Sequence, residues 1–412
     1  MKKSLLILFF CLFVVMIGYG LILPVLPLYI ERLALTGGAP PSQASFQVGI
    51  LTGVFALMQF FFAPLWGKWS DQLGRRPLFL TGLGGYAISM FLFSVGTNLV
   101  MLYSARILGG ALSAALLPMA NAYVADMTSE KDRGRGMAWL GSTISLGIVV
   151  GPALGAFLSQ FDLHLTYKFG HISVDGFSIP FFGAGLLSVL ALIVAKLWLR
   201  ESLKPQELKL LDHQQGLEYG LNLRSTRWFI PRWLRLFLAL AFLNQFALAT
   251  FEGTFALHAK ELLQFGPSEM GWVFAMCGII MAAAPAVVVS WLIGRLGEKL
   301  LLPTGFALTG VALAMLMTAQ RMDFILSNVA LFALGVALIG PSLATLVSKR
   351  AGGRPGAALG QLNGASSLGL ASGPALAGFL LAWKVHAPYL LTALMLVATS
   401  VYLTMTMLHR SE

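Results

Sequence analysis

The sequence predicts an all-α membrane protein with twelve transmembrane helices in two pseudo-symmetric six-helix bundles. Three observations predict this fold class. Hydrophobic residues make up 57% of the 412 residues and charged residues only 11%, whereas a soluble protein carries about 25% charged residues. The apolar residues form blocks of about 20, the length that crosses a bilayer core. The two halves of the chain also share a repeated sequence.

The apolar blocks predict helices rather than barrel strands. In lipid every backbone amide needs an internal partner, so only helices and closed barrels span the membrane. Barrel strands alternate apolar and polar residues, whereas these blocks are apolar on all sides. The spans that we expect cover 4–30, 46–66, 77–96, 98–125, 136–160, 179–199, 233–257, 270–293, 300–319, 324–347, 356–383 and 387–408.

Lysine and arginine indicate the orientation, because they are more frequent in cytoplasmic loops than in outer loops. With the N-terminus in the cytoplasm, 22 of the 28 basic residues fall in cytoplasmic segments, 5 in outer loops and Arg106 within a span. We therefore expect both termini in the cytoplasm and a multi-pass protein of the cell inner (plasma) membrane. This distribution also accounts for the net charge of +11 without a nucleic-acid partner.

The longest polar stretch, 200–232, divides the chain into two bundles, 1–199 and 233–412, joined by a cytoplasmic linker. The bundles repeat one another. SLGIVVGPALGAFL around Gly151 matches SLGLASGPALAGFL around Gly373 at an offset of 222 residues, and Pro118 and Pro341 are 223 apart. Repeats of six helices around a central substrate site are a transporter architecture.

The loop GKWSDQLGRRPLFL, residues 67–80, predicts a latch on the cytoplasmic side. Glycine permits a tight turn, and two arginines beside an aspartate form a charge cluster that holds one conformation and breaks in another. Simple membrane anchoring would need the arginines but not the glycines and aspartate. The second-half copy, SWLIGRLGEK, lacks the aspartate and has Glu298 at the first arginine position. The latch residues that we expect from this loop are Gly67, Asp71, Gly74, Arg75 and Arg76. Asp126 closes span four at the same end, where a capping or loop-facing carboxylate is the alternative.

Two charged residues fall inside spans. Arg106 lies about two turns within span four and Glu252 within span seven. A charge at this depth costs at least about 2.5 kcal/mol and usually faces a cavity. We expect Glu252 to take up a proton readily and to bind a proton or a cationic substrate. The alternatives are an arginine that reaches the outer surface and an interfacial glutamate, because Lys260 and Glu261 follow closely.

Span five carries Gly147, Gly151, Pro152 and Gly155. The glycines recur every four residues, which places them on one helix face and lets another helix approach closely. Generic packing explains the same pattern. Polar residues that we expect along a central cavity are Gln59, Asn121, Asn244, Gln245, Gln361 and Asn363. For any single one, contact with lipid or a neighbouring helix is the alternative.

These motifs resemble the major facilitator superfamily over residues 5–405. The 67–76 loop fits the superfamily signature G-x-x-x-D-x-x-G-R-[RK], and GxxxGPxxG in span five resembles the antiporter motif of drug exporters. FEGTF around Glu252 is similar to span seven of NorA-type multidrug exporters. Span one is similar to tetracycline exporters, although it has Val15 where they carry an aspartate. The resemblance implies that Arg106 serves proton coupling and that Asp126 pairs with Asp71 and Arg75.

The expected function is proton-coupled export of lipophilic, cationic drugs by a monomer through alternating access. No nucleotide-binding loop of the type G-x-x-x-x-G-K-[ST] occurs, so an ion gradient would supply the energy. We expect no cofactor and no metal. The alternatives are a narrow-specificity metabolite or tetracycline-like exporter and a glycolipid flippase of the same fold. A membrane enzyme or receptor is a third, disfavoured because the sequence offers no catalytic constellation.

Overall fold

The computed structural model describes most of the chain. The described residues are 3–22, 25–37, 41–158, 165–166, 173–174, 178–203, 230–263, 267–352, 355–384 and 386–408. The expected linker falls largely outside them, since 204–229 are not described. The last helix before this gap ends at Trp198 and the next begins at Arg232.

In its described part, the first half consists of helices and one short pair of strands. Its elements are α1 Lys3–Ile22, α2 Leu26–Thr36, α3 Pro41–Leu73, α4 Arg75–Ser94, α5 Leu99–Ser113, α6 Leu116–Met127, α7 Arg133–Leu158, β1 Leu165–Thr166, β2 Ser173–Val174 and α8 Ser178–Trp198. The two strands pair antiparallel, with Leu165 opposite Val174.

The second half consists of helices in its described part. They are α10 Arg232–Leu263, α11 Pro267–Ala284, the π-helical turn η1 Pro285–Val289, α12 Ser290–Leu316, α13 Met322–Arg350, α14 Pro355–Trp383 and α15 Ala387–Leu408. Helices cover each of the twelve ranges expected from the sequence. The all-α class is therefore confirmed.

Three of the expected spans are interrupted. The ranges 4–30 and 98–125 each hold two helices, and Pro118 lies in the first turn of α6, where a missing N–H is tolerated. The range 270–293 contains η1, which starts at Pro285 because its ring removes a helical hydrogen bond. These interruptions of a helix do not change the run of apolar residues, so the apolar blocks alone did not predict where they occur.

Eight helical stretches among the described residues are long and apolar enough to cross a membrane. One of them, Glu269–Leu316, holds two of the expected spans, separated where Gly297 leaves the helical conformation. The stretches do not include α3, α7 and α14, so a count of twelve transmembrane helices stays a prediction. These three helices contact the opposite half of the molecule.

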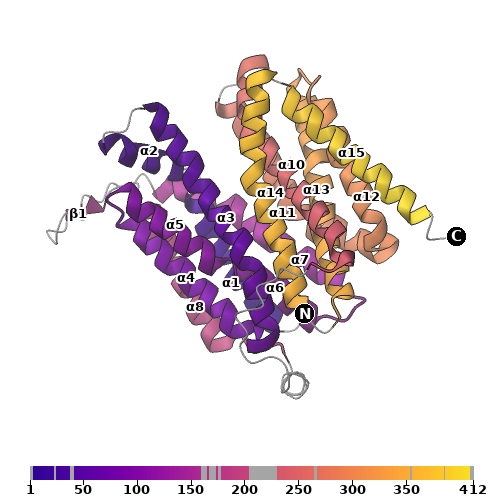
Figure 1. Ribbon diagram of the computed structural model, residues 1–412, viewed down its shortest axis with the longest axis horizontal. Helices are drawn as coiled ribbons and strands as arrows, with labels where there is room; N and C mark the ends of the chain where they lie inside the picture. Colours follow the sequence, from indigo (N-terminus) through magenta and orange to yellow (C-terminus); the bar gives the residue numbers. More distant parts are fainter. Residues whose placement is uncertain are drawn as a thin grey trace.

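Equivalent glycines join helix pairs within each half. A Cβ at Gly147 would lie 2.5 Å from Met16 Cβ, and one at Gly20 would lie 2.8 Å from the Cα of Gly151, so α1 and α7 touch along their backbones. In the second half Gly369 and Gly373 meet α10 in the same way. Figure 1 shows the two sets of helices close together in the lower part of the view and diverging toward the top.

Candidate functional site

A charge cluster at the α3–α4 loop consists of the buried Asp71 and Arg75 together with Asp126 at the end of α6. Arg75 Nη1 lies 2.7 Å from Asp71 Oδ1, and Arg75 Nε lies 3.0 Å from Asp126 Oδ2. The Arg75 side chain is 1% exposed. Since a buried cation is stable only when paired, these two carboxylates together hold the guanidinium in place between α4, α3 and α6.

Asp71 also joins the two halves of the molecule. Its two carboxylate oxygens accept hydrogen bonds from the backbone N–H groups of Gly356, at 3.0 Å, and Ala357, at 2.8 Å. These groups belong to the first turn of α14, and a helix N-terminus favours a negative charge. A Cβ at Gly67 would clash with the Gly356 carbonyl, so the backbones of α3 and α14 are in contact beside this bond.

The second arginine of the loop points elsewhere. Arg76 donates from Nη2 to the Lys196 carbonyl at 2.6 Å. The backbone N–H groups of Arg75 and Arg76 both donate to the Glu201 carboxylate, at 2.9 and 3.0 Å. Sequence reasoning missed Glu201, an acidic residue directly after span six that binds the start of α4. An isolated glutamate among basic residues was the available signal.

The span-five motif lies at the α1–α7 contact. Gly147 and Gly151 both face α1, and Pro152, next to Gly151, is near Gly20. Gly155 lies within α7, but its surroundings fall outside the described part. The close contact leaves no room for side chains at these glycines, which makes α1 and α7 a rigid pair.

Glu252 lies in α10, about 30 Å along the helix from Arg232. Its side chain is exposed, and no hydrogen bond or ion pair joins it to a described residue. The Tyr19 phenol of α1 and the Cys277 thiol of α11 lie within its electrostatic range. Because Tyr19 belongs to the other half, Glu252 faces the space between the bundles.

Arg106 is buried within the first bundle instead of lining an open cavity. It is 4% exposed, and its guanidinium carbon lies 5.0 Å from the ring centres of both Phe55 and Phe93. Its Nε has no hydrogen-bond partner among the described residues. Tyr19 and Tyr86 lie within electrostatic range. Sequence reasoning missed Tyr19, which is near both charged residues.

The amide side chains do not converge on one point. Asn121 and Asn363 donate to carbonyls one turn earlier in their own helices, those of Leu117 and Leu359. Among the described residues, Asn244 Oδ1 and Gln361 Oε1 are buried without a partner. The backbone contact of Gly369 places Gln245 beside α14. Gln59 accepts a 3.4 Å bond from Ser367, so one expected cavity residue joins α3 to α14.

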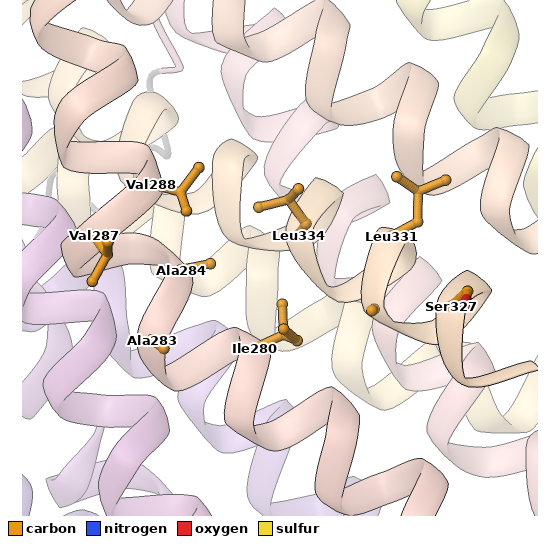
Figure 2. Close-up of a pocket in the computed structure, with 9 residues that line it drawn as sticks. Ile280, Ala283, Ala284, Val287, Val288, Ser327, Leu331 and Leu334 are labelled. Atoms are coloured by element: carbon orange, nitrogen blue, oxygen red, sulfur yellow. The ribbon is translucent and has the colours of Figure 1, made fainter. Parts of the chain in front are cut away.

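An apolar pocket of about 600 Å³ lies between α11, η1 and α13, and Figure 2 shows the residues that line it. Ile280, Val287, Val288 and Leu334 are among its lining residues, and Ser327 is its one polar side chain. None of the expected cavity residues lines it. The pocket can accept an apolar group but offers no charge to orient one.

The chain is similar to known proteins over nearly its whole length. The family model described as Major Facilitator Superfamily matches residues 8–351 and 237–412. "Multidrug resistance protein 2" of Bacillus subtilis is 29% identical over 407 residues, covering 96% of this chain and 95% of that protein. "Quinolone resistance protein NorA" of Staphylococcus aureus is 26% identical over 392 residues, covering 94% and 92%.

Two solved structures share the fold. The human organic anion transporter MFSD10 superposes with a TM-score of 0.79 at 22% identity, covering 98% of this chain and 100% of that chain. The proton:xylose symporter XylE superposes with a TM-score of 0.74 at 15% identity, covering 97% and 95%. At these identities the likeness concerns the fold alone.

Proposed function

The chain belongs to the Major Facilitator Superfamily, and we propose that it is a proton-coupled exporter of lipophilic, cationic drugs. It is a multi-pass membrane transporter and not an enzyme. Drug export is supported by the similarity to proteins named for multidrug and quinolone resistance. We place it in the plasma membrane as a monomer with both termini in the cytoplasm, as its loop charges favour.

Glu252 is the observation that carries the proposal. An exposed carboxylate without an ionic partner, deep along a transmembrane helix, can bind either a proton or a cation. When it is protonated the cation has no counter-charge, and when it is ionised a cationic drug can replace the proton. This exchange is antiport. Phe274 of α11, which is exposed and packs against Phe251 of α10, offers an aromatic surface that suits lipophilic groups.

Alternating access requires a contact that forms in one state and breaks in the other. The Asp71 bonds to α14 join the halves at the end of the molecule that we assign to the cytoplasm. In this arrangement the cytoplasmic side is closed, and the helices diverge toward the outer side (Figure 1). Gly67, Asp71, Gly74, Arg75, Arg76 and Asp126 would form the latch that has to open for drug entry.

Arg106 would act in coupling through Tyr19. The Tyr19 phenol is within electrostatic range of both Arg106 and Glu252, so it senses a change of charge at either residue. The span-five residues Gly147, Gly151, Pro152 and Gly155 would keep α1, which carries Tyr19, fixed to α7. Asn121, Asn244, Gln245, Gln361 and Asn363 would supply polar contacts to substrate.

Ethidium transport in inverted membrane vesicles tests the proposal. With an imposed proton gradient, wild type should accumulate the dye and Glu252→Gln should lose this accumulation. Glu130→Gln, which changes an exposed carboxylate outside the spans, is the matched control and should behave as wild type. Unchanged accumulation in Glu252→Gln would remove Glu252 from coupling. No dye movement in well-expressed wild type would favour a narrow-specificity exporter or a lipid flippase.

A further inference from the structure

The end of α10 opposite Arg232 carries a histidine that the transport proposal does not use. His258 is 2% exposed, and its Nδ1 atom has no hydrogen-bond partner within the described ranges. A buried nitrogen without a partner is costly in a folded protein. The unpaired Nδ1 of His258 therefore either lowers the stability of the fold to no purpose or binds a ligand in some states of the protein.

A second histidine lies beside it. His386 is exposed and belongs to the turn between α14 and α15. The two ring centres are 5.4 Å apart and the ring planes make an angle of 66°. An imidazole nitrogen binds Zn²⁺ at about 2.0–2.1 Å, so each ring centre lies about 3 Å from the metal, and two such rings at a tetrahedral angle have centres about 5 Å apart. The observed spacing fits one shared ion.

The surroundings fix the first ring and keep it neutral. Tyr389, which is fully buried, packs edge-on against His258 with ring centres 4.9 Å apart, and its hydroxyl lies 3.2 Å from Thr254 Oγ1. Burial and the neighbouring His386 lower the pKa of His258 to about 4. The imidazole is therefore neutral at pH 7, which is the form that binds metals.

We propose that His258 and His386 form a binding site for a borderline divalent transition metal, Zn²⁺, Ni²⁺ or Cu²⁺. Imidazole ligands favour these ions over Mg²⁺ and Ca²⁺. The described residues contain no group of three or more His, Cys, Asp and Glu that could hold a metal, so water completes the coordination. One face of the ion stays open to solvent because His386 is exposed.

A bound ion would tie α10 to the α14–α15 turn. His258 lies on the same helix as Glu252, six residues farther along, and α10 packs along α14. The ion would therefore restrain the outer end of the helix that carries the proposed transport carboxylate. Binding itself does not depend on the proposed drug export, so failure of one proposal leaves the other standing.

The test measures Ni²⁺ binding to the purified full-length protein, prepared without a histidine tag, by isothermal titration calorimetry. Wild type should bind one ion per chain. Removing a residue that only holds a metal ligand in place lowers metal affinity 10–100-fold. His386→Gln removes a proposed ligand itself, so it should weaken Ni²⁺ binding by at least about tenfold. His386→Asp should keep much of the affinity because a carboxylate can still ligate. His171→Gln, at a histidine elsewhere in the chain, should match wild type.

Cu²⁺ electron paramagnetic resonance supplies a second measurement that does not rely on affinity. Wild type should show coupling to two imidazole nitrogens, and His386→Gln to one. Since His386 is exposed, this variant should fold normally, which thermal unfolding in the absence of metal would verify. Absence of saturable Ni²⁺ binding in wild type, or unchanged binding in His386→Gln, would overturn the proposal.

Discussion

The two halves build the same loop with opposite charges. At an offset of 223 residues, Arg75 corresponds to Glu298 and Asp126 to Lys349. Arg75 and Asp126 pair at 3.0 Å, and Lys349 and Glu298 pair at 2.8 Å. Each half thus has an ion pair between the helix that follows the loop and the end of a later helix. The acidic and the basic partner are exchanged between the two halves. The two halves therefore keep an ion pair at this place with opposite arrangements of charge.

The position that holds the latch aspartate in the first half holds a different residue in the second half. Asp71 corresponds to Gly294, where no carboxylate is available. Arg135 fills that space, with Nη2 3.1 Å from where a Cβ of Gly294 would be. Within the described ranges, Asp71 of the first-half loop accepts hydrogen bonds from a helix N-terminus of the other half, whereas Gly294 has no side chain that could do so. We infer that the first loop controls the conformational state and that the second mainly supports its own bundle.

The largest expected difference concerns the basic partner of each ion pair, Arg75 and Lys349. Arg75→Ala leaves the buried Asp71 carboxylate without its cationic partner and should lower stability by about 3–5 kcal/mol. Lys349→Ala should cost about 1 kcal/mol or less, because its side chain is 29% exposed and water screens the pair. Thermal unfolding in detergent measures both. Equal losses would mean that the two loops are energetically equivalent.

A smaller effect is expected from Asp71→Asn. The substitution keeps the size but removes the charge from both bonds to α14, and charge-assisted bonds contribute about 1.5–3 kcal/mol each. A loss of about 2 kcal/mol would change the population ratio of the two states about 30-fold. Spin labels at Val100 and Trp272, which are both exposed, would report the separation of the outer ends.

In this experiment the outer ends should approach one another in Asp71→Asn, since opening of the cytoplasmic side closes the outer side. Glu130→Gln, at an exposed carboxylate outside the spans, is the control and should leave the label distance unchanged. A distance distribution in Asp71→Asn that equals that of wild type would show that the Asp71 bonds do not hold the state.

The smallest difference is expected at the two loop glycines. Gly74 and Gly297 have φ values of 97° and 76°, which side chains rarely adopt, so each change to alanine should cost about 1–3 kcal/mol. A Cβ at Gly74 would also lie 2.6 Å from Glu201 Oε2, whereas nothing lies within 4 Å at Gly297. Gly74→Ala should therefore unfold at a lower temperature than Gly297→Ala. The reverse order would show that Glu201 moves aside freely.

The fold could be predicted from the sequence because apolar blocks and glycine repeats are local patterns. The Asp71–Arg75 pairing was also accessible, since the two residues are four apart and close in any tight loop. Arg106 shows where this reasoning stops. A charge within a span predicts a cavity, but whether the side chain meets water or Phe55 and Phe93 depends on helix rotation, which the sequence pattern does not specify.

Tyr19 and Glu201 were missed for the same physical reason. Their importance comes from partners far away in the chain, Glu252 for Tyr19 and the backbone of Arg75 and Arg76 for Glu201. Arg76 was expected among the latch charges but donates to Lys196. Contacts of this kind follow from how helices are placed against one another, and a single sequence carries no direct record of that placement.

The contact between α3 and α14 has a kinetic consequence. Gly67 and Gly360 let the two backbones touch without interlocking side chains. Such smooth surfaces can separate without rotamer changes, so packing adds little to the activation barrier for opening. At this contact the barrier then comes mainly from side-chain bonds, the two of Asp71 and the one from Ser367 to Gln59, and these few bonds govern how fast the two helices part.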